Sequence, residues 1–93
     1  MALGIYFHPE SMSAEQYDRV TRRLEESGQG SPAGRSYHSA FVVGGGIHVF
    51  DVWDSQEDFE RFGQTLMPIL QEEGVDLGEP DISPIHNTKI GSS

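Results

Sequence analysis

The chain has 93 residues, 35% of them hydrophobic and 23% charged, so we expect a single small domain over residues 1–90 with a thin core. Six Lys and Arg against fifteen Asp and Glu give a net charge of −9, which argues against partners that need a basic face, nucleic acid or an anionic membrane. The absence of cysteine excludes disulfides and thiolate chemistry. Without a signal-peptide pattern or a long apolar run, we expect a cytoplasmic protein.

The first third of the chain predicts a strand followed by a helix. Residues 2–7 form an apolar run of strand length. Ser13 and Gln16 then form a capping-box pattern, which predicts that a helix begins there. Its apolar stripe is made by Tyr17, Val20 and Leu24. Gly28 is a natural C-terminal stop, and the glycine-rich residues 28–36 are expected to form a loop.

The middle of the chain predicts a β-hairpin. Residues 37–43 and 47–53 are rich in β-branched and aromatic side chains, and three glycines, 44–46, separate them. If all three glycines form the loop, His38 and His48 share one face of the hairpin and lie roughly 13 Å apart, too far to share a metal ion. The opposite face then carries Tyr37, Phe41, Asp51 and Trp53.

The last third predicts a second helix and a final strand. Ser55 caps a helix over residues 56–73, whose buried stripe includes Phe62. We expect Pro68 to kink or break this helix, because it removes one backbone hydrogen bond and clashes with the preceding turn. Residues 81–86 read as an edge strand, and residues 91–93 as a disordered tail.

The resulting order, β-α-β-β-α-β, predicts an α+β, ferredoxin-like fold in which two helices cover one face of a four-stranded antiparallel sheet. Both faces of the central hairpin carry apolar side chains. Because a monomer rarely exposes so much continuous apolar surface, we expect a homodimer in which two sheets pack against each other.

One segment resembles a known superfamily. Residues 47–62, IHVFDVWDSQEDFERF, are similar to the strand-to-helix signature of dimeric α+β barrel proteins: a strand that ends in Trp, an acid-Ser cap and a helix with an early aromatic residue. With the closing residues 84–87, the chain resembles small actinobacterial members of the antibiotic-biosynthesis-monooxygenase-like group. The resemblance implies a dimeric α+β barrel with a pocket between sheet and helices in each subunit.

The chemistry implied by this resemblance is varied and includes cofactor-free oxygenation of phenolic polyketides, cyclisation, lactone isomerisation and plain ligand binding. Trp53 matches a tryptophan of haem-degrading members. The Asn and His that accompany it in those members are missing from residues 2–7 and 56–73. We therefore expect no haem, and because His38 and His48 are expected to lie too far apart to share a metal ion, we expect an enzyme that acts without a metal or an organic cofactor.

Histidines are the strongest candidates for catalysis, because imidazole can take up a proton near neutral pH. We predict His38 or His48 as general base, with Tyr37 or Tyr6 as hydrogen-bond donor to a developing enolate. The expected substrate-binding residues are Tyr6, Phe41, Asp51, Trp53 and Phe62. Asp51 lies in mid-strand among apolar neighbours, so we expect it to be paired, with Arg35 or Arg61 as candidates.

The leading hypothesis is a cofactor-independent monooxygenase, cyclase or isomerase of secondary metabolism that acts on a hydrophobic, aromatic or polyketide-like molecule. The alternative is a homodimeric small-molecule-binding or stress-related protein without catalytic activity. An interior cavity of about 300 Å³ or more would favour the enzyme, whereas a filled interior would favour the alternative.

Overall fold

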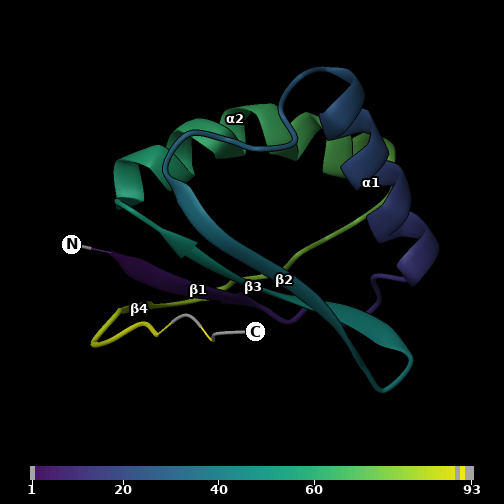
Figure 1. Cartoon of the computed structure of the whole chain (residues 1–93). Helices are drawn as coiled ribbons and strands as arrows, with labels where there is room; N and C mark the ends of the chain where they lie inside the picture. Colours follow the sequence, from purple (N-terminus) through teal and green to yellow (C-terminus); the bar gives the residue numbers. More distant parts are fainter. Residues whose placement is uncertain (1, 90, 92–93) are drawn as a thin grey trace.

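The computed structural model describes residues 2–89 and 91, and over these it confirms the predicted fold class (Figure 1). The strands are β1 (Leu3–Phe7), β2 (Arg35–Val43), β3 (Gly46–Trp53) and β4 (Asp81–Pro84), and the helices are α1 (Ala14–Glu26) and α2 (Gln56–Glu72). The strands form one antiparallel sheet in the order β2-β3-β1-β4, and both helices lie over the same face of it. Positions 92 and 93 of the predicted tail lie outside the described residues.

Helix α1 begins where the capping pattern predicts. The Ser13 hydroxyl accepts from the backbone N–H of Gln16 at 3.1 Å, and the Gln16 side chain accepts from the backbone N–H of Ser13 at 2.9 Å. These bonds satisfy two amides that have no partner within the helix. Val20 and Leu24 are buried against the sheet, and Gly28 follows the C-cap with a φ of +81°, which suits glycine.

Helix α2 runs without interruption through Pro68, so the predicted break is wrong. Pro68 lies on the exposed side of the helix, whereas Leu66 and Leu70 on the other side pack into the core. Burial of these neighbours outweighs the loss of one backbone hydrogen bond, which is how tertiary packing overrides local propensity.

The hairpin turn contains two glycines rather than three, which corrects the predicted register. Gly44 and Gly45 have φ values of +57° and +85°, as a type I′ turn requires, and Gly46 already pairs with Val43. This register places His38 opposite Asp51 and Phe41 opposite His48. A slip of one residue moves a whole strand to the other face, so His38 and His48 lie on opposite faces of the sheet.

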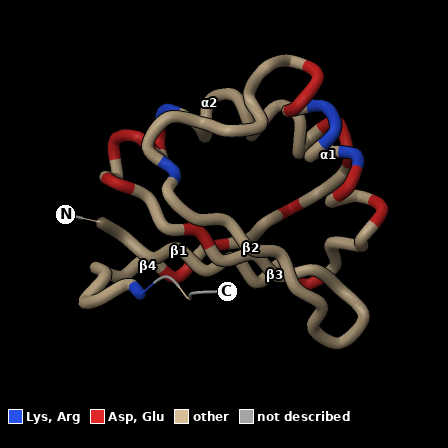
Figure 2. The backbone as a smooth tube through the Cα atoms, viewed as in Figure 1, with Lys and Arg blue, Asp and Glu red and all other residues tan. Residues whose placement is uncertain are grey.

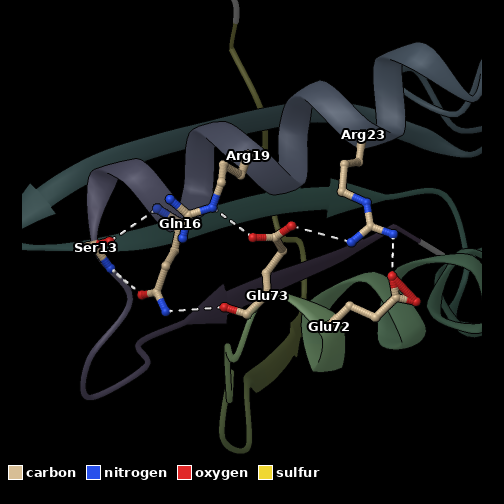
Figure 3. Close-up of polar contacts among 6 residues, drawn as sticks. All are labelled: Ser13, Gln16, Arg19, Arg23, Glu72 and Glu73. Carbon is tan, nitrogen blue, oxygen red and sulfur yellow. Dashed lines mark hydrogen bonds and ion pairs between the residues drawn. The ribbon is translucent and has the colours of Figure 1, made fainter.

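The two helices are joined by a polar cluster at the C-terminal end of α2 (Figure 3). Arg19 Nε donates to the Glu73 carboxylate at 2.7 Å, and Arg23 bonds both Glu72 and Glu73. The hydrogen bond from Arg19, followed by that from Arg23, lowers the pKa of Glu73, while the hydrogen bond to Glu72 raises the pKa of Arg23. These ion pairs link α1 to the C-terminal end of α2 on the helix side of the sheet.

Strand β4 is an edge strand beside β1, as predicted, but it ends at Pro84 rather than at residue 86. Proline cannot donate to a ladder, so pairing stops there, and the Ile85 N–H instead bonds the Ala2 carbonyl at 2.9 Å. Among the described residues, neither helix is long and apolar enough to cross a membrane.

Candidate functional site

A cavity of about 230 Å³ lies between the helices and the sheet. Apolar side chains from both layers form most of its wall, among them Phe7, Val20, Leu24, Phe62, Leu66 and Leu70. Its volume is smaller than the roughly 300 Å³ at which ligand sites usually begin, yet the interior is not filled. The space matches the position that the resemblance implied.

A buried carboxylate lies beside this cavity. Asp51, in the middle of β3, is only 5% exposed. One carboxylate oxygen lies 2.6 Å from His38 Nδ1, and the other accepts from Trp53 Nε1 at 3.2 Å. The predicted partners, Arg35 and Arg61, are both wrong: the corrected register places His38 directly across from Asp51, and Arg61 pairs with acids of its own helix.

His38 continues the hydrogen-bonded chain to helix α1. Its Nε2 lies 2.6 Å from the hydroxyl of Tyr17, and the two rings are stacked with 6.0 Å between centroids. An ionised carboxylate only accepts, so with Asp51 ionised and His38 neutral the proton of the ring is on Nδ1. Nε2 is then the acceptor, and the Tyr17 hydroxyl donates to it.

The chain Tyr17–His38–Asp51 has the arrangement of a general base. Asp51 orients the ring of His38 and stabilises the imidazolium that forms when Nε2 takes a proton. Tyr17, His38 and Asp51 all line the cavity, so the proton-accepting end of the chain faces the space a ligand would occupy. The arrangement can remove an acidic proton from a molecule held against the apolar wall.

Two of the predicted substrate-binding aromatics lie on this side of the sheet, in different roles. Phe62 lines the cavity. Trp53 is fully buried, packs against Phe59 and Phe62 with centroids 5.6 and 5.5 Å away, and is not part of the cavity wall. Trp53 therefore supports the site as packing and as a hydrogen-bond donor to Asp51.

The other predicted residues lie on the open face of the sheet. Tyr6 and His48 are brought together, with the Tyr6 hydroxyl 2.6 Å from His48 Nδ1, and Phe41 stacks on Tyr6 at 6.2 Å. Tyr37 is 49% exposed beside Phe50. None of the four predicted residues lines the cavity. The two-glycine turn places Tyr37, Phe41 and His48 on one face of the hairpin, away from the helices. Tyr6 of β1 lies on the same face because it pairs with Phe50 of β3.

Sequence reasoning missed Tyr17 as a site residue, because its spacing with Val20 and Leu24 made it one position of an apolar stripe. One signal was available. A tyrosine in a stripe that faces the core carries a hydroxyl that needs a partner, and a histidine on the facing strand can supply one.

A second hollow, of about 620 Å³, lies between the segment after β1 and residues 76–81. Its walls are mostly loop residues, and its His8 pairs with Asp81 at 3.2 Å. Within the described part of the chain, no three His, Asp or Glu side chains gather in a way that could hold a metal ion. The smaller cavity is the candidate site because it alone combines an apolar wall with the hydrogen-bonded base.

Comparison with known proteins gives likeness in fold. No protein-family model matches the sequence, and no curated protein does. Among solved structures, the chain is similar to a structural-genomics protein, YJCS, with a TM-score of 0.65 and 13% identity over 92% of this chain and 100% of the other. It is also similar to NE2512, a protein of unknown function from Nitrosomonas europaea, with a TM-score of 0.62 and 15% identity over 99% and 94% of the two chains.

A third similar structure is SnoaB, a cofactor-independent oxygenase from Streptomyces nogalater. The TM-score is 0.61, and the identity is 15% over 94% of this chain and 93% of SnoaB. At such identity the likeness establishes the ferredoxin-like α+β fold and no more. The chemistry therefore depends on the cavity and on the side chains that line it.

Proposed function

We propose that the protein is a cofactor-independent enzyme that removes an acidic proton from a hydrophobic, phenolic or polyketide-like molecule bound between sheet and helices. The single observation that carries this proposal is the Tyr17–His38–Asp51 chain, whose two contacts of 2.6 Å end at an apolar cavity. A buried carboxylate without a partner would destabilise the folded protein. Because Asp51 is paired with His38, it instead stabilises the protonated form of this base.

In the proposed step, the substrate proton passes to the Tyr17 oxygen while the Tyr17 proton passes to His38 Nε2. The negative charge of Asp51 stabilises the imidazolium, and the substrate is left as an enolate or carbanion. The cavity wall excludes water from this anion, so competing protonation by solvent is reduced. The protein contributes binding, orientation and proton transfer.

The enolate can follow one of two routes. In oxygenation it reduces O₂, and overall a CH₂ group becomes a carbonyl, with one oxygen atom retained in the product and the other released as water. In cyclisation or isomerisation the enolate attacks or is reprotonated at another carbon, and no O₂ is consumed. The likeness in fold to the oxygenase SnoaB supports the first route.

We also propose that the protein works as a homodimer in which a second copy covers the open face of the sheet. Charged residues lie mainly on the helices and their connecting loops (Figure 2). The only charged residues in β1, β2 and β3 are Arg35 and Asp51, and both lie on the helix side. On the open face, the edge strand β4 adds one carboxylate, Asp81, opposite Tyr6. Because each copy carries a charge of −9, two copies approach most easily through the part of this face that β1, β2 and β3 form, which carries no charged side chain.

The function is tested with dithranol, a tricyclic phenol with an acidic CH₂ group, and with a panel of phenolic polyketides. Deuterium exchange at the acidic carbon, measured without O₂ in D₂O, reports proton abstraction, and O₂ uptake with product analysis reports oxygenation. We expect exchange well above the rate with heat-denatured protein. Binding of the panel without exchange or O₂ uptake would contradict the enzyme and favour the non-catalytic binding protein.

A further inference from the structure

Among the described residues, Arg35 at the start of β2 is the only Lys or Arg that lines the cavity. Three other arginines, Arg19, Arg23 and Arg61, are engaged in ion pairs with Glu or Asp. In contrast, no carboxylate of residues 2–89 and 91 forms such a pair with the half-buried Arg35. In a chain with fifteen acidic residues, a cation in a cavity without an acidic partner suggests that the partner comes from a ligand.

A β-bulge directs Arg35 toward the cavity. Arg35 pairs with Trp53 of β3, and Tyr37 pairs with the adjacent Val52. Ser36 is therefore an extra residue in β2. Without this insertion, residues 35 and 38 would lie on opposite faces of the strand, because side chains alternate. The bulge places Arg35 on the same face as His38, as bulges near functional sites commonly do.

The guanidinium of Arg35 is held in place with most of its donors still available. Its carbon lies 5.8 Å from the centroid of the Phe62 ring, and one N–H donates to the Gly30 carbonyl at 3.1 Å. A guanidinium has five N–H donors in a rigid fork that fits a carboxylate. Within the described residues only one of them has an acceptor, so the fork is oriented and can still receive an anion.

We propose that Arg35 forms an anion-binding subsite, and that the ligand of this cavity is an apolar, aromatic molecule with a carboxylate group. This inference rests on the proposed function, since it names the kind of molecule that the same cavity holds. The carboxylate binds Arg35, and the apolar body lies against Phe62 and its neighbours, with its acidic carbon toward Tyr17.

Neither of the two acidic side chains that line the cavity, Glu25 and Asp51, forms an ion pair with Arg35. Asp51 is occupied by His38 and Trp53, and Glu25 has an exposed side chain that makes no ion pair with Arg35. A partly buried position strengthens a charge-assisted hydrogen bond relative to one in water. Arg35 is therefore the one group in the cavity wall that favours an anionic ligand over a neutral one of equal shape.

The test uses naphthoate and naphthamide, which differ in charge but hardly in shape, and measures their dissociation constants by calorimetry. We expect the wild-type protein to bind naphthoate about tenfold more tightly than naphthamide. Arg35→Gln should lose this preference and keep the affinity for naphthamide. Arg22→Gln, which removes an exposed positive charge from α1, is the matched control and should keep the preference.

A direct measurement on the wild-type protein covers the case in which Arg35→Gln fails to fold. The NMR signal of the Arg35 side-chain N–H should shift when naphthoate is added and change little with naphthamide. Equal affinity for the two probes, or a preference that survives in Arg35→Gln, would overturn the anion subsite and leave the proposed function standing. Failure of both probes to bind would contradict the ligand-binding cavity itself, and with it both proposals.

Discussion

The two faces of the sheet carry the same pair of side chains in different surroundings. On the helix side, Tyr17 contacts His38 at 2.6 Å, and on the open side, Tyr6 contacts His48 at 2.6 Å. His38 is backed by the buried Asp51 and lines a cavity. Among the described residues, His48 has aromatic neighbours and no carboxylate partner.

This difference distinguishes a histidine that can act as a general base from a histidine that is only hydrogen-bonded to a tyrosine. A histidine becomes a general base when an acid orients one nitrogen and a ligand can reach the proton acceptor at the other end. Of His38 and His48, only His38 meets both conditions. The aromatic surroundings of His48 fit a surface that a second copy covers, and the predictions below test this division.

The largest expected effect separates the two histidines. His38→Gln should lower the rate of proton abstraction from the active probe by about 10² to 10⁴, because it removes the group that takes the proton. His48→Gln is the matched control and should change this rate little. Both rates are measured by deuterium exchange, and a greater loss in His48→Gln would reverse the assignment of the two faces.

Asp51→Asn is expected to have the next largest effect. The amide is nearly the same size as the carboxylate but is neutral, so it no longer stabilises the imidazolium, and the rate should fall about tenfold to a hundredfold. The pH dependence of the rate should also change, which a purely structural role would not cause. An unchanged rate and pH profile in a folded variant would remove Asp51 from the mechanism.

The open face is tested by adding a charge to it. Phe41, 40% exposed, lies on this face, and Phe41→Asp should convert a dimer into a monomer of 10.3 kDa, measured by light scattering. Val42→Asp adds the same charge at a 72% exposed position on the helix side of the sheet and should leave the dimer intact. A wild-type protein that is monomeric at micromolar concentration would contradict the proposed dimer.

The smallest effect is expected at the polar cluster between the helices (Figure 3). The pKa of Glu73 is lowered from its usual 4.5, so its contribution to stability is complete above that value and is lost as the pH falls through the lowered pKa. Glu73→Gln should therefore lower the Tm by a few degrees near neutral pH and by less in strong acid. Glu26→Gln, at an exposed position, is the control; a Tm difference that does not shrink in acid would exclude this ionic contribution.

Much of the fold could be predicted from local signals in the sequence. The capping box at Ser13, the stop at Gly28 and the cap at Ser55 all act within one helical turn, so they are readable without tertiary information. The register of the hairpin, in contrast, could not be predicted from local signals. Three consecutive glycines allow either a two-residue or a three-residue loop, and the choice decides which face every side chain of one strand occupies.

The candidate site followed the same division. His38 and Asp51 were identified from residue type, since an acid and an imidazole among apolar strand residues are unusual, and Phe62 from the apolar stripe of α2. The pairing of Asp51 with His38 depended on the register, and the position of Arg35 depended on a bulge that no local pattern reveals. At Pro68 the local signal was strong but misleading: proline predicts a break in the helix, yet α2 continues because the neighbouring Leu66 and Leu70 pack into the core.

The most direct test of the central claim is NMR mapping of where dithranol binds to the isotope-labelled protein. The account predicts shifts at the methyl groups of Val20, Leu24 and Leu70 and at the ring of His38, all of which surround the cavity. The methyl groups of Val43 on the open face should shift little. Shifts confined to the open face, around Val43 and His48, would contradict the claim that the helix-covered face holds the site.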